Sequence, residues 1–215
     1  MGLFLNPGND AFTADTFFDA MVHMDKPSAY FCFMPESALR DVFPELLRLR
    51  GVPQPPEHHK EGDVWNHTML VLDEAAKLRS LAGQPLAFML SALTHDLGKY
   101  STTETIDGRI RAFGHEEAGA PMAETLLRRF TDDAELIGYV TNMCRLHMRP
   151  NMLAAQNSGQ KAVNRLLRLS EAPGDLLLLA KADHMGRIDP PDYSAAEEYL
   201  KAGLAAYTAS ESRDK

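Results

Sequence analysis

Six side chains of types that ligate metal ions recur at the ends of predicted helices whose apolar faces would be buried. They are His67 in "WNHTML", the neighbours His95 and Asp96 in "THDLGK", His115 in "FGHEEAG", His147 in "RLHMRP" and Asp183 in "KADHMGR". Burying each polar group without a partner costs on the order of a few kcal/mol. One divalent ion can satisfy several of them at once. Neutral imidazole with carboxylate suits Mn, Fe, Ni, Co or Zn, and a site richer in carboxylate and water also suits Mg.

His95 and Asp96 are adjacent in the sequence, and this restricts where both side chains can bind the same ion. Adjacent residues on a helix point about 100° apart, so both reach one region only where the helix faces a cavity or ends. Gly98, two positions later, predicts such an end. The imidazole can then ligate end-on, while the carboxylate, with two oxygens, can bridge two ions. The alternative is a local hydrogen bond between His95 and Asp96 with a structural role only.

The elements that must position these groups are predicted to be helices, so the fold class is all-α. Gly51 and Gly83 end two of the predicted helices, and Pro85 begins another. Proline spacing predicts a loop before Val64, and Asp107-Gly108 predicts a small hairpin or irregular excursion over 101–113. The predicted helical segments are 13–24, 35–51 with an interruption at Pro44, 64–81, 85–99, 115–130, 134–148, 160–171, 174–187 and 194–208. We expect one compact domain over 37–215, with residues 1–36 as an N-terminal helical extension.

Composition limits the partners and the compartment. The net charge of −8 disfavours binding of extended nucleic acid, which depends on Lys and Arg neutralising phosphates. The two cysteines, Cys32 and Cys144, have no zinc-ligand spacing and favour a reduced, cytoplasmic setting. The start, "MGLFLNPGND", lacks the basic region of a secretory signal, and no stretch reaches the roughly 20 apolar residues of a membrane helix. The oligomeric state is left open.

Five ordered segments resemble a known family. They are "ALRDVFPELLRLRGVPQP", "HHKEGDVWNHTMLVLDEAA", "ALTHDLGK", "GHEEAGAP" and "KADHMGR", between Ala38 and Arg187. With the order His67, His95-Asp96, Asp183, they resemble the HD-domain metal-dependent phosphohydrolases. The resemblance is greatest to the C-terminal HD domain of bacterial tRNA nucleotidyltransferases, the CCA-adding enzymes.

The resemblance implies an HD-domain helical bundle with a divalent metal site in its core. The family's ligands correspond to His67, His95, Asp96 and Asp183, and two-metal members use two further histidines, whose order His115 and His147 match. His115 at a helix start and His147 at a helix end could instead serve as capping groups. For this branch the resemblance implies 2′,3′-cyclic phosphodiesterase, 2′-nucleotidase or phosphatase activity on a small-molecule nucleotide or an RNA 3′ end. The ion is expected to be Mn, Ni, Mg, Fe or Co, with one or two bound.

Departures from related families narrow this expectation. The sequence shows no Gly-Gly-x-Val-Arg-Asp segment, so we expect no CCA addition. "LGKY" follows His95-Asp96 where ppGpp hydrolases have a Glu-Asp pair. Lys60 stands where the branch usually has proline, and the stretch 148–167 departs from the branch pattern. Alternative functions are a (deoxy)nucleotide mono- or triphosphate phosphohydrolase, and a non-catalytic metal-stabilised module that binds a nucleotide or a protein.

Candidate catalytic and substrate-binding residues follow from the chemistry of a metal-activated water. Asp96 is the candidate for orienting or deprotonating that water. Lys99, three positions on, lies on nearly the same helix face and can reach a phosphate oxygen, although a lysine in a last helical turn is commonly a solvated cap. Arg109 and Arg111, two apart in an extended piece, share one face and can bind phosphate, or are plain surface charges. The branch adds His58 and His59 as phosphate contacts, although loop histidines are usually inert.

Overall fold

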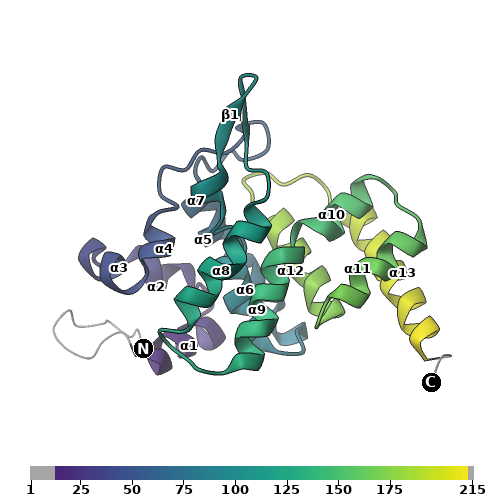
Figure 1. The fold of residues 1–215 in the computed structure, drawn as a ribbon, viewed down its shortest axis with the longest axis horizontal. Coiled ribbons are helices and arrows are strands. Elements are labelled where there is room, and N and C mark those ends of the chain that lie inside the picture. The colour runs from purple at the N-terminus through teal and green to yellow at the C-terminus, as the bar shows by residue number, and fades with distance from the viewer. Residues whose placement is uncertain (1–12, 213–215) are drawn as a thin grey trace.

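The helices that carry the candidate ligands form the centre of the fold, and the predicted all-α class is confirmed. The computed structural model describes residues 13–212 (Figure 1). The central helices are α5 (Val64–Leu78), α6 (Pro85–Thr94), α8 (His115–Leu127), α9 (Ala134–Leu146) and α12 (Pro173–Met185). Helix α5 packs on α6 and α12, α6 packs on α9, and α8 packs on α9. The ligand-bearing segments therefore meet in space although they are far apart in the sequence.

Local signals explain where these helices begin and end. The Asp63 side chain accepts hydrogen bonds from Asn66 N at 2.9 Å and Gly51 N at 2.8 Å, so it caps α5 and ties down the preceding turn. The predicted helix 64–81 is α5 followed by the short η1 (Arg79–Leu81). Helix α6 ends at Thr94, earlier than the predicted helix 85–99, so His95 and Asp96 lie just beyond the helix and in the turn that Gly98 indicated.

The N-terminal segment contributes aromatic side chains to the core. Its helices are α1 (Ala14–His23), α2 (Ser28–Cys32), α3 (Glu36–Val42) and α4 (Pro44–Leu47). The Thr13 cap of α1 is confirmed, since its side chain accepts from Thr16 N at 3.3 Å. Phe17 is fully buried, with its ring centroid 5.0 Å from Phe43 and 4.8 Å from Phe130. The sequence start "MGLFLNPGND" lies outside the described residues.

The C-terminal part differs from expectation at one element. Helices α10 (Met148–Ala155), α11 (Gln160–Leu169) and α13 (Ser194–Glu211) pack together on the right of Figure 1. The predicted helices leave out 149–159, the stretch that contains Pro150. Pro150 instead lies in the first turn of α10, where a missing backbone N–H leaves no helical hydrogen bond unmade. Within residues 13–212, no helix is both long and apolar enough to span a bilayer.

The predicted excursion over 101–113 is a projecting hairpin. It follows α7 (Lys99–Thr102) and consists of β1 (Glu104–Ile106) and β2 (Arg109–Arg111), paired antiparallel at the top of Figure 1. Asp107 and Gly108 have φ of 50° and 72° at its tip. Two consecutive positive φ angles are typical of the tight turns that join hairpin strands. The hairpin thus leaves the body after α7, the short helix that begins at Lys99, and returns shortly before His115.

A close crossing fixes the base of this hairpin. A Cβ on Gly98 would overlap the carbonyl oxygen of His115 and would lie 2.6 Å from the backbone nitrogen of Gly119. Only glycine therefore allows the turn after Asp96 to lie directly on the first turns of α8. This contact brings the His115 end of α8 against the His95-Asp96 turn.

A buried carboxylate joins α9 and α12 to the start of α6. Asp175 accepts from Tyr139 Oη at 2.6 Å and from Gly83 N at 2.9 Å. Burial, together with this carboxylate, raises the pKa of Tyr139. Because a hydrogen bond to a charged group contributes about 1.5–3 kcal/mol, we expect Tyr139→Phe to lower the free energy of unfolding by about 2 kcal/mol in urea denaturation. Tyr207→Phe, on half-buried α13, is the control, and equal loss in both variants would contradict the assignment.

Candidate metal centre

The six predicted ligands converge from five central helices. His67 lies in the second turn of α5, His95 and Asp96 follow α6, and Asp183 lies in the last turn of α12. His115 begins α8 and His147 follows α9. All six are buried, and three of them, His67, His95 and His147, are completely inaccessible. Groups separated by up to 116 positions in the sequence thus share one interior site.

One group of ligands surrounds the Oδ2 atom of Asp96. His95 Nε2 lies 3.2 Å from this oxygen and His67 Nε2 lies 3.8 Å from it. His67 Nε2 is also 3.1 Å from Asp183 Oδ1. The two imidazoles and Asp96 have ligand atoms close enough together to hold one ion. This is the His67, His95, Asp96, Asp183 set expected from the sequence.

A second group surrounds the other oxygen of Asp96. Asp96 Oδ1 lies 3.3 Å from His115 Nε2 and 3.7 Å from His147 Nε2. The two Nε2 atoms are 3.3 Å from each other. Asp96 therefore presents one oxygen to each group, the arrangement required of a carboxylate that bridges two ions.

The hydrogen bonding of these groups fits a cation. His95 Nε2 and both carboxylate oxygens of Asp96 are buried and make no well-directed hydrogen bond with the described residues. The Lys99 ammonium does lie 2.7 Å from Asp96 Oδ2 and donates to Gln54 Oε1 at 2.9 Å. Unsatisfied polar atoms in an interior are costly, and several of them converging on one point is the pattern that a metal ion satisfies. The donor set of imidazole nitrogen and carboxylate oxygen suits Mn, Fe, Ni, Co or Zn.

Three of the four imidazoles are held in the same way. Each donates Nδ1–H to the backbone carbonyl three residues earlier, because a carbonyl can only accept. The pairs are His95 with Ala92 at 2.8 Å, His115 with Ala112 at 2.7 Å, and His147 with Cys144 at 2.7 Å. The Nε2 lone pair of each ring is thereby directed at the site, which orients it as a metal ligand.

The carboxylates are in the form that ligates a cation. Burial alone raises the pKa of Asp96, but the nearby charges of His95 and Lys99 outweigh burial and leave its pKa well below the usual range. Burial likewise opposes ionisation of Asp183, but its hydrogen bond with His67 and the nearby positive charges together lower its pKa. Burial lowers the pKa of His67, yet hydrogen bonds to Asp183 and Glu61 leave it raised. Any bound metal competes with protons for these imidazoles.

Glu61 is a residue that sequence reasoning missed. Its side chain is 1% exposed, and Oε1 accepts from His67 Nδ1 at 3.0 Å and from His59 Nδ1 at 2.7 Å. Burial raises its pKa, but the hydrogen bonds from His67, from His59 and from backbone N–H groups together outweigh burial and lower the pKa to about 2. A glutamate in a proline-rich loop carries little sequence signal, since most such carboxylates are solvated. Its position six residues before His67 and two after His59 was the only available indication.

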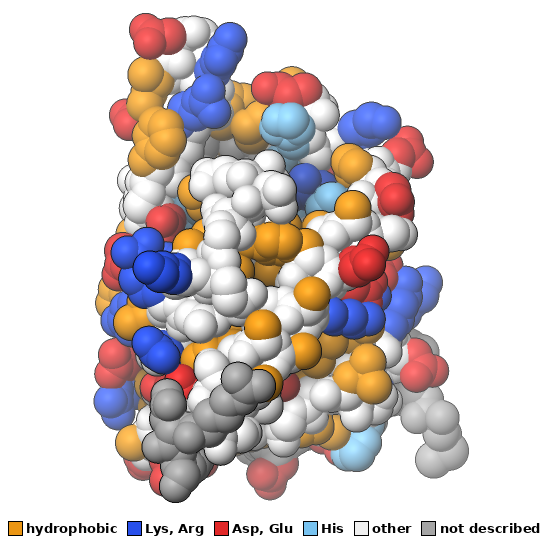
Figure 2. All heavy atoms as spheres, turned by 90° about the vertical axis from the view of Figure 1, so that its right-hand side faces the viewer, with side chains coloured by type: hydrophobic (Ala, Val, Ile, Leu, Met, Phe, Trp, Pro, Cys, Tyr) orange, Lys and Arg blue, Asp and Glu red, His pale blue; other side chains and the backbone are white. Residues whose placement is uncertain are grey.

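The candidate substrate contacts are divided between the centre and the surface. Lys99 and His59 lie at the centre's edge, with side chains 13% and 11% exposed. His58 is exposed in the loop. Arg109 and Arg111 are exposed on β2, and no hydrogen bond or ion pair among residues 13–212 joins their side chains to the cluster. Figure 2 shows blue Lys or Arg side chains on the projection at its upper left, the hairpin of Figure 1. The phosphate-binding roles remain predictions.

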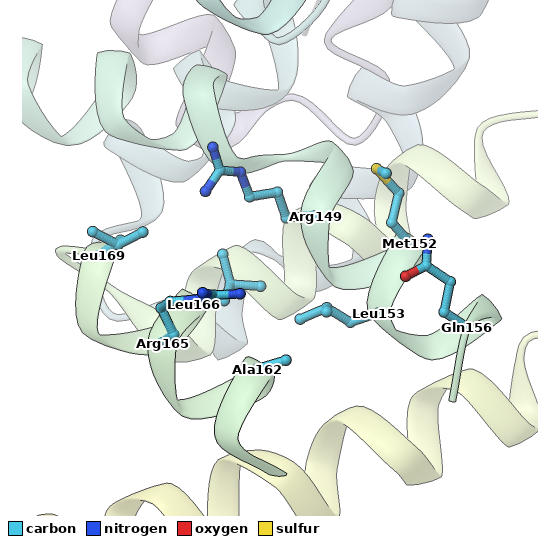
Figure 3. Close-up of a pocket in the computed structure, with 8 residues that line it drawn as sticks. All are labelled: Arg149, Met152, Leu153, Gln156, Ala162, Arg165, Leu166 and Leu169. Atoms are coloured by element: carbon cyan, nitrogen blue, oxygen red, sulfur yellow. The ribbon is translucent and has the colours of Figure 1, made fainter. Parts of the chain in front are cut away.

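A separate pocket lies between α10 and α11. Its volume is about 240 Å³, and Arg149, Leu153, Arg165 and Leu166 are among the residues that line it. Figure 3 shows Arg149 and Arg165 extending from these two neighbouring helices beside apolar side chains. None of the predicted ligands or substrate contacts lines this pocket. It is therefore distinct from the candidate metal centre.

A comparison with known proteins identifies a family whose sequence model matches this chain. The sequence model of the family described as HD domain matches residues 64–188, which include all six candidate ligands. A Multifunctional CCA protein of Cupriavidus metallidurans is 36% identical over 190 residues, covering 84% of this chain and 44% of the relative. One from Chromobacterium violaceum is 37% identical over 193 residues (85% and 45%), and one from Methylococcus capsulatus is 47% identical over 105 residues (48% and 23%). The chain thus spans less than half the length of these curated relatives.

Proposed function

The chain belongs to the HD domain family, and we propose that it is a divalent-metal-dependent phosphohydrolase acting on nucleotides or RNA termini. The reaction class that we propose is hydrolysis of a 2′,3′-cyclic phosphodiester or of a terminal phosphomonoester. The observation that carries the proposal is Asp96, which presents one buried oxygen to each of two histidine groups. Such a centre supports hydrolysis by two ions or by one.

Each residue near Asp96 has a proposed role. A bound divalent ion supplies Lewis acidity and a water that ionises near neutral pH. Asp96, one of the groups that would hold the ion, would orient or deprotonate this water. Lys99, whose ammonium lies 2.7 Å from Asp96 Oδ2, moves to a phosphate oxygen of the substrate and offsets the charge that develops there. The almost complete burial of the cluster excludes bulk water.

The substrate is proposed to be small or terminal. The net charge of −8 opposes binding of a long polyanion. The relatives are named Multifunctional CCA proteins, and the chain matches less than half of each. We propose that the matched part acts on a nucleotide or on an RNA 3′ end and that it adds no CCA sequence.

The experiment is metal-dependent turnover. Protein stripped with chelator and reloaded with Mn²⁺ or Ni²⁺ is expected to hydrolyse 2′,3′-cyclic AMP or an aryl phosphate. The double variant His95→Ala, Asp96→Ala is expected to be inactive and to bind less metal. His23→Ala with Asp25→Ala, two exposed residues of the same types, is the matched control.

Other outcomes are equally informative. Turnover that survives in the double variant overturns the proposal. Preference for (deoxy)nucleotide mono- or triphosphates in a substrate panel assigns the alternative hydrolase reaction. Metal bound in the wild type without turnover of any ester assigns a binding module.

A further inference from the structure

We propose that Glu61 is a positioning residue for the metal centre, and that it makes His67 the strongest of the imidazole ligands. This inference rests on the metal centre of the proposed function. It adds a residue outside the six predicted ligands. It also gives His59, which lies in the proline-rich loop, a structural role beside His67.

The contacts of Glu61 form one hydrogen-bonded hub. Its Oε1 accepts from His59 Nδ1 at 2.7 Å and from His67 Nδ1 at 3.0 Å. Its Oε2 accepts from Ile188 N at 3.3 Å, just beyond α12. The two imidazole rings pack edge to face, with centroids 4.8 Å apart. One carboxylate thereby joins the proline-rich loop, α5 and the end of the helix that carries Asp183.

The local structure of α5 explains why His67 needs such a partner. The other three imidazoles lie at helix ends, where carbonyls are free of the helical ladder. The carbonyl three residues before His67 is that of Val64, inside α5, and it already accepts the Thr68 hydroxyl at 2.8 Å. His67 Nδ1–H must therefore find an acceptor outside its own helix. Glu61 supplies this acceptor.

A carboxylate acceptor has a different effect from a carbonyl. Hydrogen bonds to an ionised group are roughly twice as strong as neutral ones. A carboxylate bonded to the far nitrogen of an imidazole raises the basicity of the ligating nitrogen and fixes the ring. His67 Nε2, which faces Asp183 and Asp96, is consequently a stronger donor to a cation than the three carbonyl-held rings.

The hub could also be read as a metal site of its own, because His59, Glu61 and His67 have ligand atoms close together. The geometry favours hydrogen bonds. The Nδ1 atom of His59 and the Nδ1 atom of His67 both lie within hydrogen-bond distance of the same oxygen, Glu61 Oε1. An ion there together with one at Nε2 would require a fully deprotonated His67 ring. An extra bound ion that disappears in the Glu61 variants would overturn our assignment.

The first experiment measures metal affinity without substrate. Mn²⁺ is titrated into metal-free protein in competition with a chromophoric chelator, for wild type, Glu61→Gln, Glu61→Ala and the control Glu57→Gln. Glu57 is exposed in the same loop. We expect Glu61→Ala to bind Mn²⁺ about 10–100-fold more weakly. Glu61→Gln, which keeps an acceptor but loses the charge, is expected to fall between Glu61→Ala and wild type. Unchanged affinity in both variants overturns the inference.

A second measurement does not require any metal. Nitrogen-15 shifts of the His67 ring at pH 8 are expected to show a proton on Nδ1 in the metal-free wild type and in Glu57→Gln, whether or not Nε2 also donates to Asp183. Glu61→Ala is expected to populate the Nε2–H tautomer. An unchanged tautomer in folded Glu61→Ala overturns the inference even if the wild type binds no ion. A wild type that binds Mn²⁺ and hydrolyses no ester overturns the proposed function alone.

Discussion

Asp96→Asn is expected to lower kcat/KM for a phosphoester substrate by more than about 100-fold. Loss of a group that merely orients a metal ligand costs about 10–100-fold, and Asp96 itself presents one oxygen to each histidine group. Asparagine keeps the size of the side chain, but it removes the negative charge and replaces one carboxylate oxygen with an amide nitrogen. Steady-state kinetics at fixed Mn²⁺, with the bound metal measured by elemental analysis, test this expectation.

The control separates the role of Asp96 from a general effect of charge. Asp41→Asn removes an equal charge from an exposed position, so its kinetics should match those of the wild type. Circular dichroism establishes that both variants are folded. A folded Asp96→Asn protein with wild-type turnover would show that neither histidine group depends on this carboxylate.

Gly98→Ala is expected to lower the free energy of unfolding by about 3 kcal/mol or more. The added Cβ would overlap the His115 carbonyl oxygen and approach Gly119 N to 2.6 Å, and backbone atoms cannot yield as a flexible side chain can. Overpacking of a tight interior commonly costs about 1–3 kcal/mol, and backbone overlap lies at the upper end of this range. For a chain of this size, the expected fall in melting temperature is roughly 6–12 °C.

The matched control is another glycine. Gly174, in the first turn of α12, has no heavy atom within 4 Å of the point that an added Cβ would occupy, so Gly174→Ala should leave stability unchanged or raise it by up to about 1 kcal/mol. Thermal unfolding of both variants measures the difference in stability. If Gly98→Ala unfolds at the wild-type temperature, the turn after Asp96 does not depend on this crossing.

The sequence predicted the ends of helices better than it predicted contacts in space. Thr13 and Pro85 are local signals, and each marks the start of a helix in the structure. Gly98 indicated a helix end close to His95 and Asp96, although the predicted helix ran to Lys99 and α6 ends at Thr94. Convergence of His67 on Asp183 has no local signal, because 116 positions separate them. Only the resemblance of ordered segments predicted that convergence.

Two features could not be predicted for physical reasons. Helix α10 begins with Pro150 in its first turn, and a proline reads equally well as a break or as a tolerated first-turn residue. The role of Glu61 depends on the loop folding back through the bridge between Pro53 and Asp63. No periodicity marks such a bridge. Both features depend on how neighbouring segments pack, which single-residue preferences do not record.

The hairpin between Lys99 and His115 has a consequence for protein engineering. Its base is fixed where Gly98 lies against α8, and its Asp107-Gly108 tip is exposed to solvent. Extra chain inserted at the tip therefore extends outward without displacing either flanking residue. We therefore expect the tip to be a permissive graft point for an epitope or a fluorescent label.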